Sequence, residues 1–226
     1  MATELRHHFV AFLDVLGFSE MVAADIGDDK QYFLGKLFRC HQSAANIFRD
    51  DPNCTITQFS DSIVVAQPYD AKNFEWFVKR VAEYQRLLLD EELLCRGGIS
   101  VNKHFSNGSF TFSAGLIAAY QVESRLARYP RVVISQDVLE LVLPKTSRTR
   151  LPRALMREDD GLVFVDYIGH TQRKRPKKLR GAVGKIVGRL ANREEPSVKE
   201  KALWLAAYSD AVLKTKLRRP RFTDLR

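Results

Sequence analysis

The sequence has no long apolar run, few cysteines and no glycine-rich phosphate loop. No apolar run in its 226 residues approaches the length of roughly 18 residues that a membrane-spanning helix requires, and residues 1–8 are too polar to begin a secretion signal. The three cysteines, Cys40, Cys54 and Cys95, are scattered, and the five histidines show no ligand spacing. No disulfide framework or cysteine metal cluster is expected. These absences predict a soluble, cytoplasmic protein.

The composition is that of an ordinary globular chain, but its charge is uneven. Hydrophobic residues make up 45% and charged residues 28%, and the length suits one domain, alone or with an appendage. Residues 1–144 carry 14 Lys and Arg against 18 Asp and Glu, a net −4, whereas residues 145–226 carry +13. Nucleic acid, a polyphosphate or an acidic partner would each explain the basic last third. Its densest run, residues 170–180, favours a solvated loop or helix end over an anion site.

Two short segments place an aspartate in apolar surroundings. Residues 9–19 (FVAFLDVLGFS) predict a strand buried on both faces, with Asp14 near its end. Residues 56–66 (ITQFSDSIVVA) predict a hairpin with Asp61 in its turn. A carboxylate beside a core is costly unless it is paired or binds a metal, and magnesium sites use one or two carboxylates. Each aspartate alone also fits a structural turn or cap, but the pair favours a divalent cation with phosphate oxygens.

The order of expected elements is β-α-α-β-β-α-β-β-α-β-α over residues 9–143, which predicts an α+β fold with a mixed sheet. The expected helices are 18–26, 31–48, 71–89, 115–128, 138–143 and a segment within 191–219. The expected strands are the segment within 9–19, then 56–59, 63–66, 93–101, 109–113, 132–134 and 161–168. Residues 145–160 are polar and basic, and no element is assigned to them.

The motifs FLDVLGF and FSDSIVV resemble the catalytic core of the class III nucleotide cyclases over about residues 8–140. The resemblance implies a ferredoxin-like core with a mainly antiparallel sheet, over residues 1–170, and a basic helical extension over 171–226. It further implies two divalent ions, Mn²⁺ or Mg²⁺, held by Asp14, Asp61 and the backbone of Val15. The turn at residues 15–19 would hold the triphosphate of a nucleotide.

A narrower resemblance is to the pyrimidine cyclases of the Pycsar anti-phage system. It is carried by four segments: RGGIS (96–100), GLIAAYQVESRLARYPRVVIS (115–135), GLVFVDY (161–167) and KALWLAAYSD (201–210). The resemblance implies a uridylate cyclase that converts UTP, or next CTP, into its 3′,5′-cyclic monophosphate, a second messenger in anti-phage defence. It also implies a homodimer with active sites at the subunit interface.

The sequence departs from adenylate and guanylate cyclases at several positions. Where those enzymes carry an Asn and an Arg on one helix, this chain has Ala119 and Glu123. Tyr120 and Arg125 lie nearby as candidate substitutes, although a core Tyr and a surface Arg are the favoured interpretation of these two residues. The positions that read a purine base fall near Thr55 and Phe112, neither of which suits adenine or guanine, and this fits a pyrimidine. The resemblance thus implies catalytic residues and substrate-binding residues. The catalytic set is Asp14, Asp61 and Arg125; the substrate-binding set is Val15, Leu16, Gly17, Phe18, Thr55, Arg96 and Phe112.

Three alternatives remain at this level. One is a purine nucleotide cyclase, and another is a catalytically silent protein of the same fold that binds a nucleotide and regulates a partner. The third is a nucleic-acid-binding module built on the basic last third. The chain lacks a helix-turn-helix, zinc ligands and interleaved aromatic and basic residues, so nucleic acid is not the expected partner.

Overall fold

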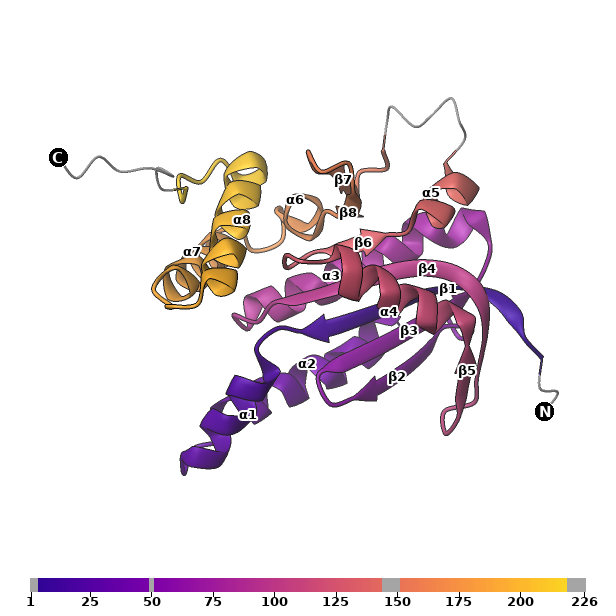
Figure 1. The fold of residues 1–226 in the computed structure, drawn as a ribbon, viewed down its shortest axis with the longest axis horizontal. Helices are drawn as coiled ribbons and strands as arrows, with labels where there is room; N and C mark the ends of the chain where they lie inside the picture. Colours follow the sequence, from indigo (N-terminus) through magenta and orange to yellow (C-terminus); the bar gives the residue numbers. More distant parts are fainter. Residues whose placement is uncertain (1–3, 49–50, 144–150, 219–226) are drawn as a thin grey trace.

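A computed structural model describes residues 4–48, 51–143 and 151–218, and its centre is an eight-stranded sheet (Figure 1). The strand order is β2-β3-β1-β4-β6-β8-β7, with β5 paired to β4. Among the described residues only β4 and β6 are parallel, so the sheet is mixed and mainly antiparallel, as the sequence predicts. The strands are β1 (Arg6–Val15), β2 (Thr55–Phe59), β3 (Ser62–Pro68), β4 (Cys95–Ser106), β5 (Thr111–Ser113), β6 (Val132–Ile134), β7 (Leu155–Arg157) and β8 (Val163–Val165).

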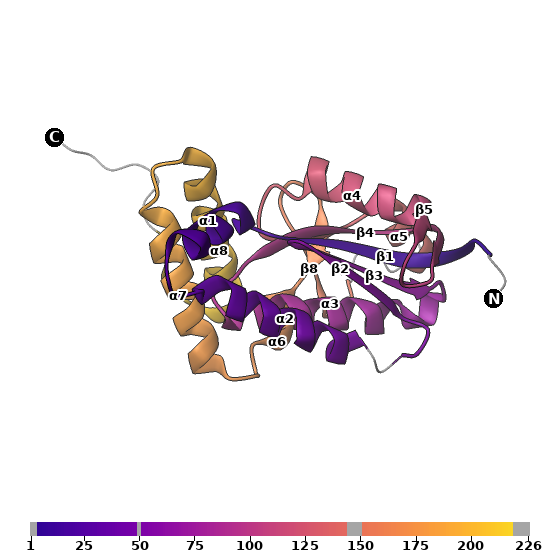
Figure 2. The ribbon, with the colours of Figure 1, turned by 90° about the horizontal axis from the view of Figure 1, so that it is seen from below.

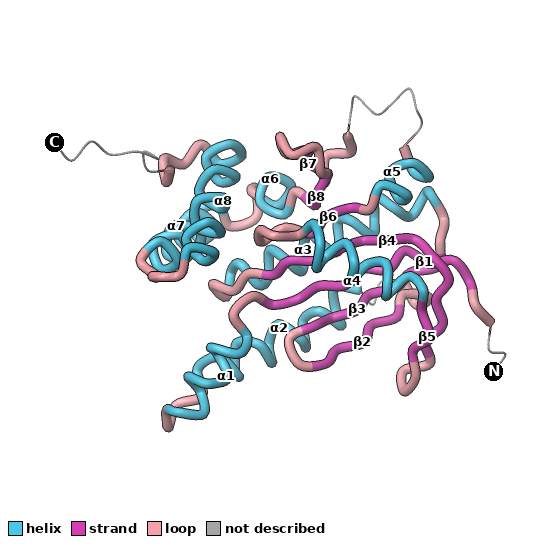
Figure 3. Tube along the Cα trace, viewed as in Figure 1, coloured by secondary structure: helices cyan, strands magenta, loops and turns pink. Residues whose placement is uncertain are grey.

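Helices cover both faces of the sheet, with α2, α3 and α6 on one side and α4 on the other (Figure 2). A pair of helices, α7 and α8, packs at one end (Figure 3). No helix in the described ranges combines the length and apolar character needed to cross a membrane. The helices are α1 (Phe18–Gly27), α2 (Tyr32–Phe48), the 3₁₀ turn η1 (Ala71–Asn73), α3 (Phe74–Asp90), α4 (Ala114–Leu126), α5 (Gln136–Val142), α6 (Tyr167–Thr171), α7 (Pro176–Ala191) and α8 (Pro196–Leu213).

The central strand β1 sorts its side chains by the two-residue period of a strand. Phe9 and Leu13 join the core beneath α2 and α3, whereas Val10 and Phe12 join a second cluster that includes Ala119 of α4. Asp14 continues the even-numbered series, so it lies on the α4 face. Because β1 is paired along both edges, with β3 and with β4, its end is fixed from two sides.

Helix α4 approaches β4 closely because β4 has a glycine where the two backbones meet. A Cβ at Gly98 would lie 2.3 Å from the carbonyl oxygen of Ala119. The Ser100 hydroxyl donates a 2.7 Å hydrogen bond to the carbonyl of Gly115 at the start of the same helix. Residues 96, 98 and 100 alternate with inward-facing Ile99, so they share the α4 face of the sheet. The helix is therefore held directly over the β4 residues that follow Arg96.

The C-terminal region departs from the predicted elements in three places. The expected strand 161–168 is wrong beyond Val165, because the Asp166 carboxylate accepts a 2.8 Å hydrogen bond from the Gly169 amide and starts α6. Strand β7 and the whole of α7 were not predicted. Helix α7 buries apolar residues at helical spacing, but three interspersed glycines and the basic run obscure that pattern. These buried residues are Leu179, Ala182, Val183, Ile186 and Val187.

Two lysines of the basic C-terminal region form ion pairs with acidic residues elsewhere in the protein. Lys174 forms a 2.9 Å ion pair with Glu83 of α3, and Lys185 forms a 3.0 Å ion pair with Glu92. Four of the five buried apolar residues of α7 belong to the same buried cluster as the sheet. The expected domain boundary after residue 170 falls inside α6 and stays a prediction.

A buried imidazole lies where α4 begins. His104 is 2% exposed, its Nδ1 is 2.8 Å from Ser113 Oγ, and its ring centroid is 5.1 Å from that of His8. Burial, with a smaller contribution from the charge of His8, lowers the pKa of His104 to about 4. The unfolded chain, whose histidines titrate near the ordinary value of about 6.5, therefore binds this proton more readily.

We expect folding stability to fall as the pH drops from about 6.5 through 4, by up to about 3 kcal/mol from His104. Urea unfolding of the wild type and His104→Gln at pH 7 and pH 4.5 measures this loss. The variant should lose less stability between the two pH values than the wild type. Equal losses in the two proteins would show that His104 does not supply the pH dependence.

Candidate active site

The structure brings the two predicted aspartates together at the end of β1. Asp14 pairs with Ser62 of β3 on one side and with Arg96 of β4 on the other. The Val15 amide donates a 3.0 Å hydrogen bond to the carbonyl of Asp61 in the β2–β3 turn. This bond joins the turn to the end of β1, so the two carboxylates are positioned by main-chain contacts.

The environment of Asp14 favours binding of a cation. Burial raises the pKa of Asp14, the charge of Asp61 raises it further, and the Arg96 guanidinium acts in the opposite direction. When the charge of one carboxylate raises the pKa of another, the two groups are close enough to bind the same cation. The Asp14 side chain retains 19% exposure, so it remains accessible from solvent.

A buried ion pair adjoins these aspartates. Arg96 Nε lies 2.5 Å from Glu123 Oε1 and 3.4 Å from Asp14 Oδ2. The Glu123 side chain is only 2% exposed, and burial raises its pKa while Arg96 lowers it. Neither Nη group of Arg96 has a hydrogen-bond partner among the residues that the structure describes. The guanidinium is thus held through one nitrogen and presents two others.

The turn between β1 and α1 supplies backbone donors beside the aspartates. Gly17 has φ of 79°, a conformation that glycine adopts without strain, and α1 begins at Phe18. The amides of Val15 and Leu16 donate to the carbonyls of Asp61 and Leu94. The amides of Gly17 and Phe18 have no such partner within the described ranges. A helix start with free amides attracts anions.

Three predicted site residues lie elsewhere in the same subunit. Phe112 pairs with Phe105 near the far end of β4, nine residues and about 30 Å along the strand from Arg96. Thr55 begins β2, at the end of the hairpin opposite the Asp61 turn. Arg125 is exposed and lies about 200° around α4 from Glu123. Within one chain, none of the three joins the paired aspartates.

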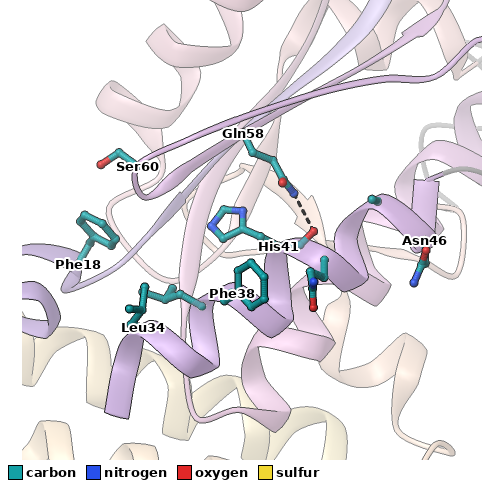
Figure 4. Close-up of a pocket in the computed structure, with 10 residues that line it drawn as sticks. Phe18, Leu34, Phe38, His41, Asn46, Gln58 and Ser60 are labelled. Carbon is teal, nitrogen blue, oxygen red and sulfur yellow. Dashed lines mark hydrogen bonds between the residues drawn. The ribbon is translucent and has the colours of Figure 1, made fainter. Parts of the chain in front are cut away.

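A groove of about 770 Å³ opens between α2 and the β2–β3 hairpin (Figure 4). It reaches the aspartate pair through Ser60, which precedes Asp61, and through Phe18 of α1. Its lining is mainly apolar and amide side chains, without an Asp, Glu, Lys or Arg among the residues that the structure describes there. Its lining residues are Phe18, Leu34, Leu37, Phe38, His41, Gln42, Ala45, Asn46, Gln58 and Ser60.

The donor set fits a divalent cation that keeps other ligands. No group of three or more His, Cys, Asp or Glu side chains in the described ranges is arranged to enclose a metal. Two neighbouring carboxylates with open solvent access suit Mg²⁺ or Mn²⁺, which bind one or two carboxylates and complete their shell with water and phosphate oxygens.

The contact between Glu123 and Arg96 was not predicted from the sequence. One signal was present: Gly115, Ala119 and Glu123 recur every four residues, which places all three on one face of a helix. Because the first two are small, that face can approach another backbone closely. A buried Glu on such a face requires a cation, and Arg96 in the RGG segment provides it.

No protein-family model and no curated protein matches the chain, but its fold is similar to several solved structures. A class III adenylyl cyclase-like ATP-binding protein from Pseudomonas aeruginosa gives a TM-score of 0.55 at 11% identity, over 75% of this chain and 40% of that one. The adenylyl cyclase CyaB from Pseudomonas aeruginosa gives 0.51 at 16% identity, over 73% and 96%.

The third similar structure is the guanylyl cyclase domain of the RhoGC fusion protein from Blastocladiella emersonii. Its monomeric form gives a TM-score of 0.52 at 9% identity, over 73% of this chain and 98% of that one. A non-canonical dimeric form of the same domain gives 0.50 at 10% identity with the same coverage. Identities this low show a shared fold, and the expected class III cyclase fold is confirmed.

Proposed function

We propose that the protein is a metal-dependent nucleotide cyclase whose active site is formed around Asp14 and Asp61. The observation that carries this proposal is the convergence of both carboxylates at the end of β1, beside a free helix start and an arginine with two free Nη groups. This combination places a cation site next to two kinds of hydrogen-bond donor for a phosphate, backbone amides and a guanidinium. A fold that hosts cyclases supports the same reaction class.

Each residue then has a distinct role in the proposed reaction. Asp14 and Asp61, with the carbonyl of Val15, would hold two Mn²⁺ or Mg²⁺ ions, which supply Lewis-acid activation of the ribose 3′-hydroxyl and neutralise the departing diphosphate. Gly17 and Phe18 offer backbone amides to the phosphates, and Arg96 offers its Nη groups. The 3′-hydroxyl gives up its proton to solvent water, its oxygen forms a bond to the α-phosphorus, and the bond between the α-phosphorus and the departing diphosphate breaks.

We propose a pyrimidine triphosphate as substrate, UTP before CTP, with the cyclic product serving as a messenger in anti-phage defence. The support is the resemblance to pyrimidine cyclases in RGGIS and in residues 115–135, together with the absence of purine-type residues at Thr55 and Phe112. A cytoplasmic location accords with the same resemblance.

A homodimer is part of the proposal, because one subunit does not bring Thr55, Phe112 or Arg125 to the aspartates. A partner subunit packed against the open side of Asp14 would supply such residues. The outer surface of helix α4 is suited to burial in an interface, because its apolar residues Ile117 and Tyr120 are 61% and 53% exposed. A guanylyl cyclase domain of similar fold has been solved as a non-canonical dimer, which shows that such a domain can associate with a second copy.

The test is product formation from ATP, GTP, CTP and UTP, each with Mn²⁺ or Mg²⁺, followed by chromatography and mass analysis. We expect UTP to give its 3′,5′-cyclic monophosphate faster than the other three. Preferential cyclisation of ATP or GTP would overturn the pyrimidine assignment and retain the cyclase. Four intact triphosphates, in a folded dimer with either metal, would overturn the cyclase itself.

The second candidate function is nucleotide binding without turnover. It is favoured by Glu123, an acidic residue at a position where related cyclases carry an arginine, and by the similarity to an ATP-binding protein. Saturable triphosphate binding with no cyclic product would support it. The nucleic-acid alternative is weakened because Lys174 and Lys185 are paired with acidic residues of this chain.

A further inference from the structure

We infer that Glu123 is a positioning residue that keeps Arg96 from occupying the metal-binding carboxylate of Asp14; this inference rests on the proposed function. Arg96 Nε is 0.9 Å closer to Glu123 than to Asp14, at 2.5 and 3.4 Å. The same guanidinium therefore has two anionic partners at unequal distances. Nε donates its hydrogen bond to Asp14 Oδ2, but the nearer charge of Glu123 limits that contact to a long one, so the Asp14 carboxylate stays available to a cation.

The backbone keeps Glu123 in this position. The α4 helix lies directly on β4, where a Cβ at Gly98 would be 2.9 Å from the Glu123 amide nitrogen and 2.3 Å from the Ala119 carbonyl. The Glu123 side chain is 2% exposed, so it has no route to solvent and remains beside Arg96. Arg96, at 33% side-chain exposure, extends from this contact toward the open side of the site.

The charges explain why the aspartates need this neighbour. Asp14, Asp61 and Glu123 carry three negative charges against the single positive charge of Arg96. If the Glu123 carboxylate were absent, Asp14 would become the nearest anion for Arg96. An ion pair on Asp14 would compete with a divalent cation for the same oxygens. The site would also lose one negative charge, and both effects weaken cation binding.

The test is Mn²⁺ binding without nucleotide, measured by calorimetric titration and by the spin-resonance signal of free Mn²⁺. The proteins are the wild type, Glu123→Gln, Arg96→Gln and the double variant. The Kd of Glu123→Gln should rise about tenfold, on the scale of one unit charge in a half-buried site. The double variant, which restores the charge balance and lacks the competing guanidinium, should return to within about threefold of the wild type.

Rescue by the second substitution separates positioning from a purely structural role, because removing Arg96 cannot repair packing lost at Glu123. A double variant that binds as weakly as Glu123→Gln would overturn the inference, as would a single variant that binds like the wild type. Arg96→Gln should bind Mn²⁺ no more weakly than the wild type, and weaker binding would also overturn it. The measurement on Arg96→Gln still tests the inference if Glu123→Gln does not fold.

The inference and the proposed function fail in different ways. If the wild type binds no Mn²⁺, or if Asp61→Asn binds it equally well, the metal site of the proposed function is wrong. If Mn²⁺ binds at the aspartates but its Kd is unchanged by Glu123→Gln, only the positioning role of Glu123 is wrong. Circular dichroism melts of every variant establish that folded proteins are compared.

Discussion

Asp61→Asn is expected to lower the rate of cyclic nucleotide formation by at least about 10³-fold, because one of only two carboxylates for the metal ions is removed. The substitution conserves size and the ability to accept a hydrogen bond from Ser62 Oγ, which lies 3.3 Å from Asp61 Oδ1. It also removes the charge that raises the pKa of Asp14. Folding stability should therefore be unchanged or slightly higher, and the loss should be confined to turnover.

The matched control is Asp137→Asn, which removes an exposed carboxylate from the first turn of α5. Initial rates at saturating Mn²⁺, with urea unfolding of each protein, measure both effects. The control should retain wild-type turnover. If Asp61→Asn kept more than about a tenth of the wild-type rate while folded, Asp61 would not be a metal ligand in the reaction.

Gly98→Ala is expected to destabilise the fold by about 3 kcal/mol, at the upper end of the usual cost of overpacking a core. The added Cβ would meet the Ala119 carbonyl at 2.3 Å and the Val122 Cβ at 2.7 Å. The first of these contacts is with backbone, so no side-chain rotation relieves it. Helix α4 would have to move off β4, carrying Glu123 away from Arg96.

Gly184→Ala in α7 provides the comparison, because a Cβ there has no neighbour within 4 Å. A glycine-to-alanine change in an open helical position stabilises by about 0.5 to 1 kcal/mol. Denaturant unfolding of the two variants should therefore give shifts of opposite sign. A Gly98→Ala protein as stable as the wild type would contradict the close packing of α4 on β4.

Much of the fold follows from patterns within single elements. The buried run around Asp14, the hairpin around Asp61 and the spacing of α2 are local signals, and each appears where it was expected. Helix α7 was missed because its apolar positions are separated by glycines and basic residues, and its stability comes from packing on distant elements. Asp166 ended β8 early because its side chain caps a helix, a choice that propensity alone does not reveal.

For the candidate site, too, one part could be predicted from the sequence and another could not. Convergence of Asp14 and Asp61 could be predicted, because each lies where a strand ends, and the structure pairs the β2–β3 hairpin with β1. The Arg96–Glu123 contact depends on how closely α4 approaches β4, which only the three-dimensional arrangement determines. The distance from Phe112 to Arg96 likewise reflects the length of β4, which continues to Ser106, five residues beyond the expected strand.

The geometry also indicates what a nucleotide would meet in one subunit. Hydrogen-bond donors for the phosphates and ligands for the cation lie together at one end of β1. Neither Thr55 nor Phe112, the residues predicted to contact the base, lies beside them. Recognition of the base would then depend on the partner subunit of the proposed dimer. Substitutions at Thr55 or Phe112 should consequently alter base preference more than metal binding.

The most direct measurement follows the α-phosphorus of the triphosphate. The dimeric protein is incubated with Mn²⁺ and UTP labelled at the α-phosphate, and both products are quantified over time. We expect the label to appear in 3′,5′-cyclic UMP with an equal amount of diphosphate, and Asp61→Asn to form neither product. Label found only in UDP or UMP, or left in UTP while the protein binds it, would contradict the proposal that this site cyclises UTP.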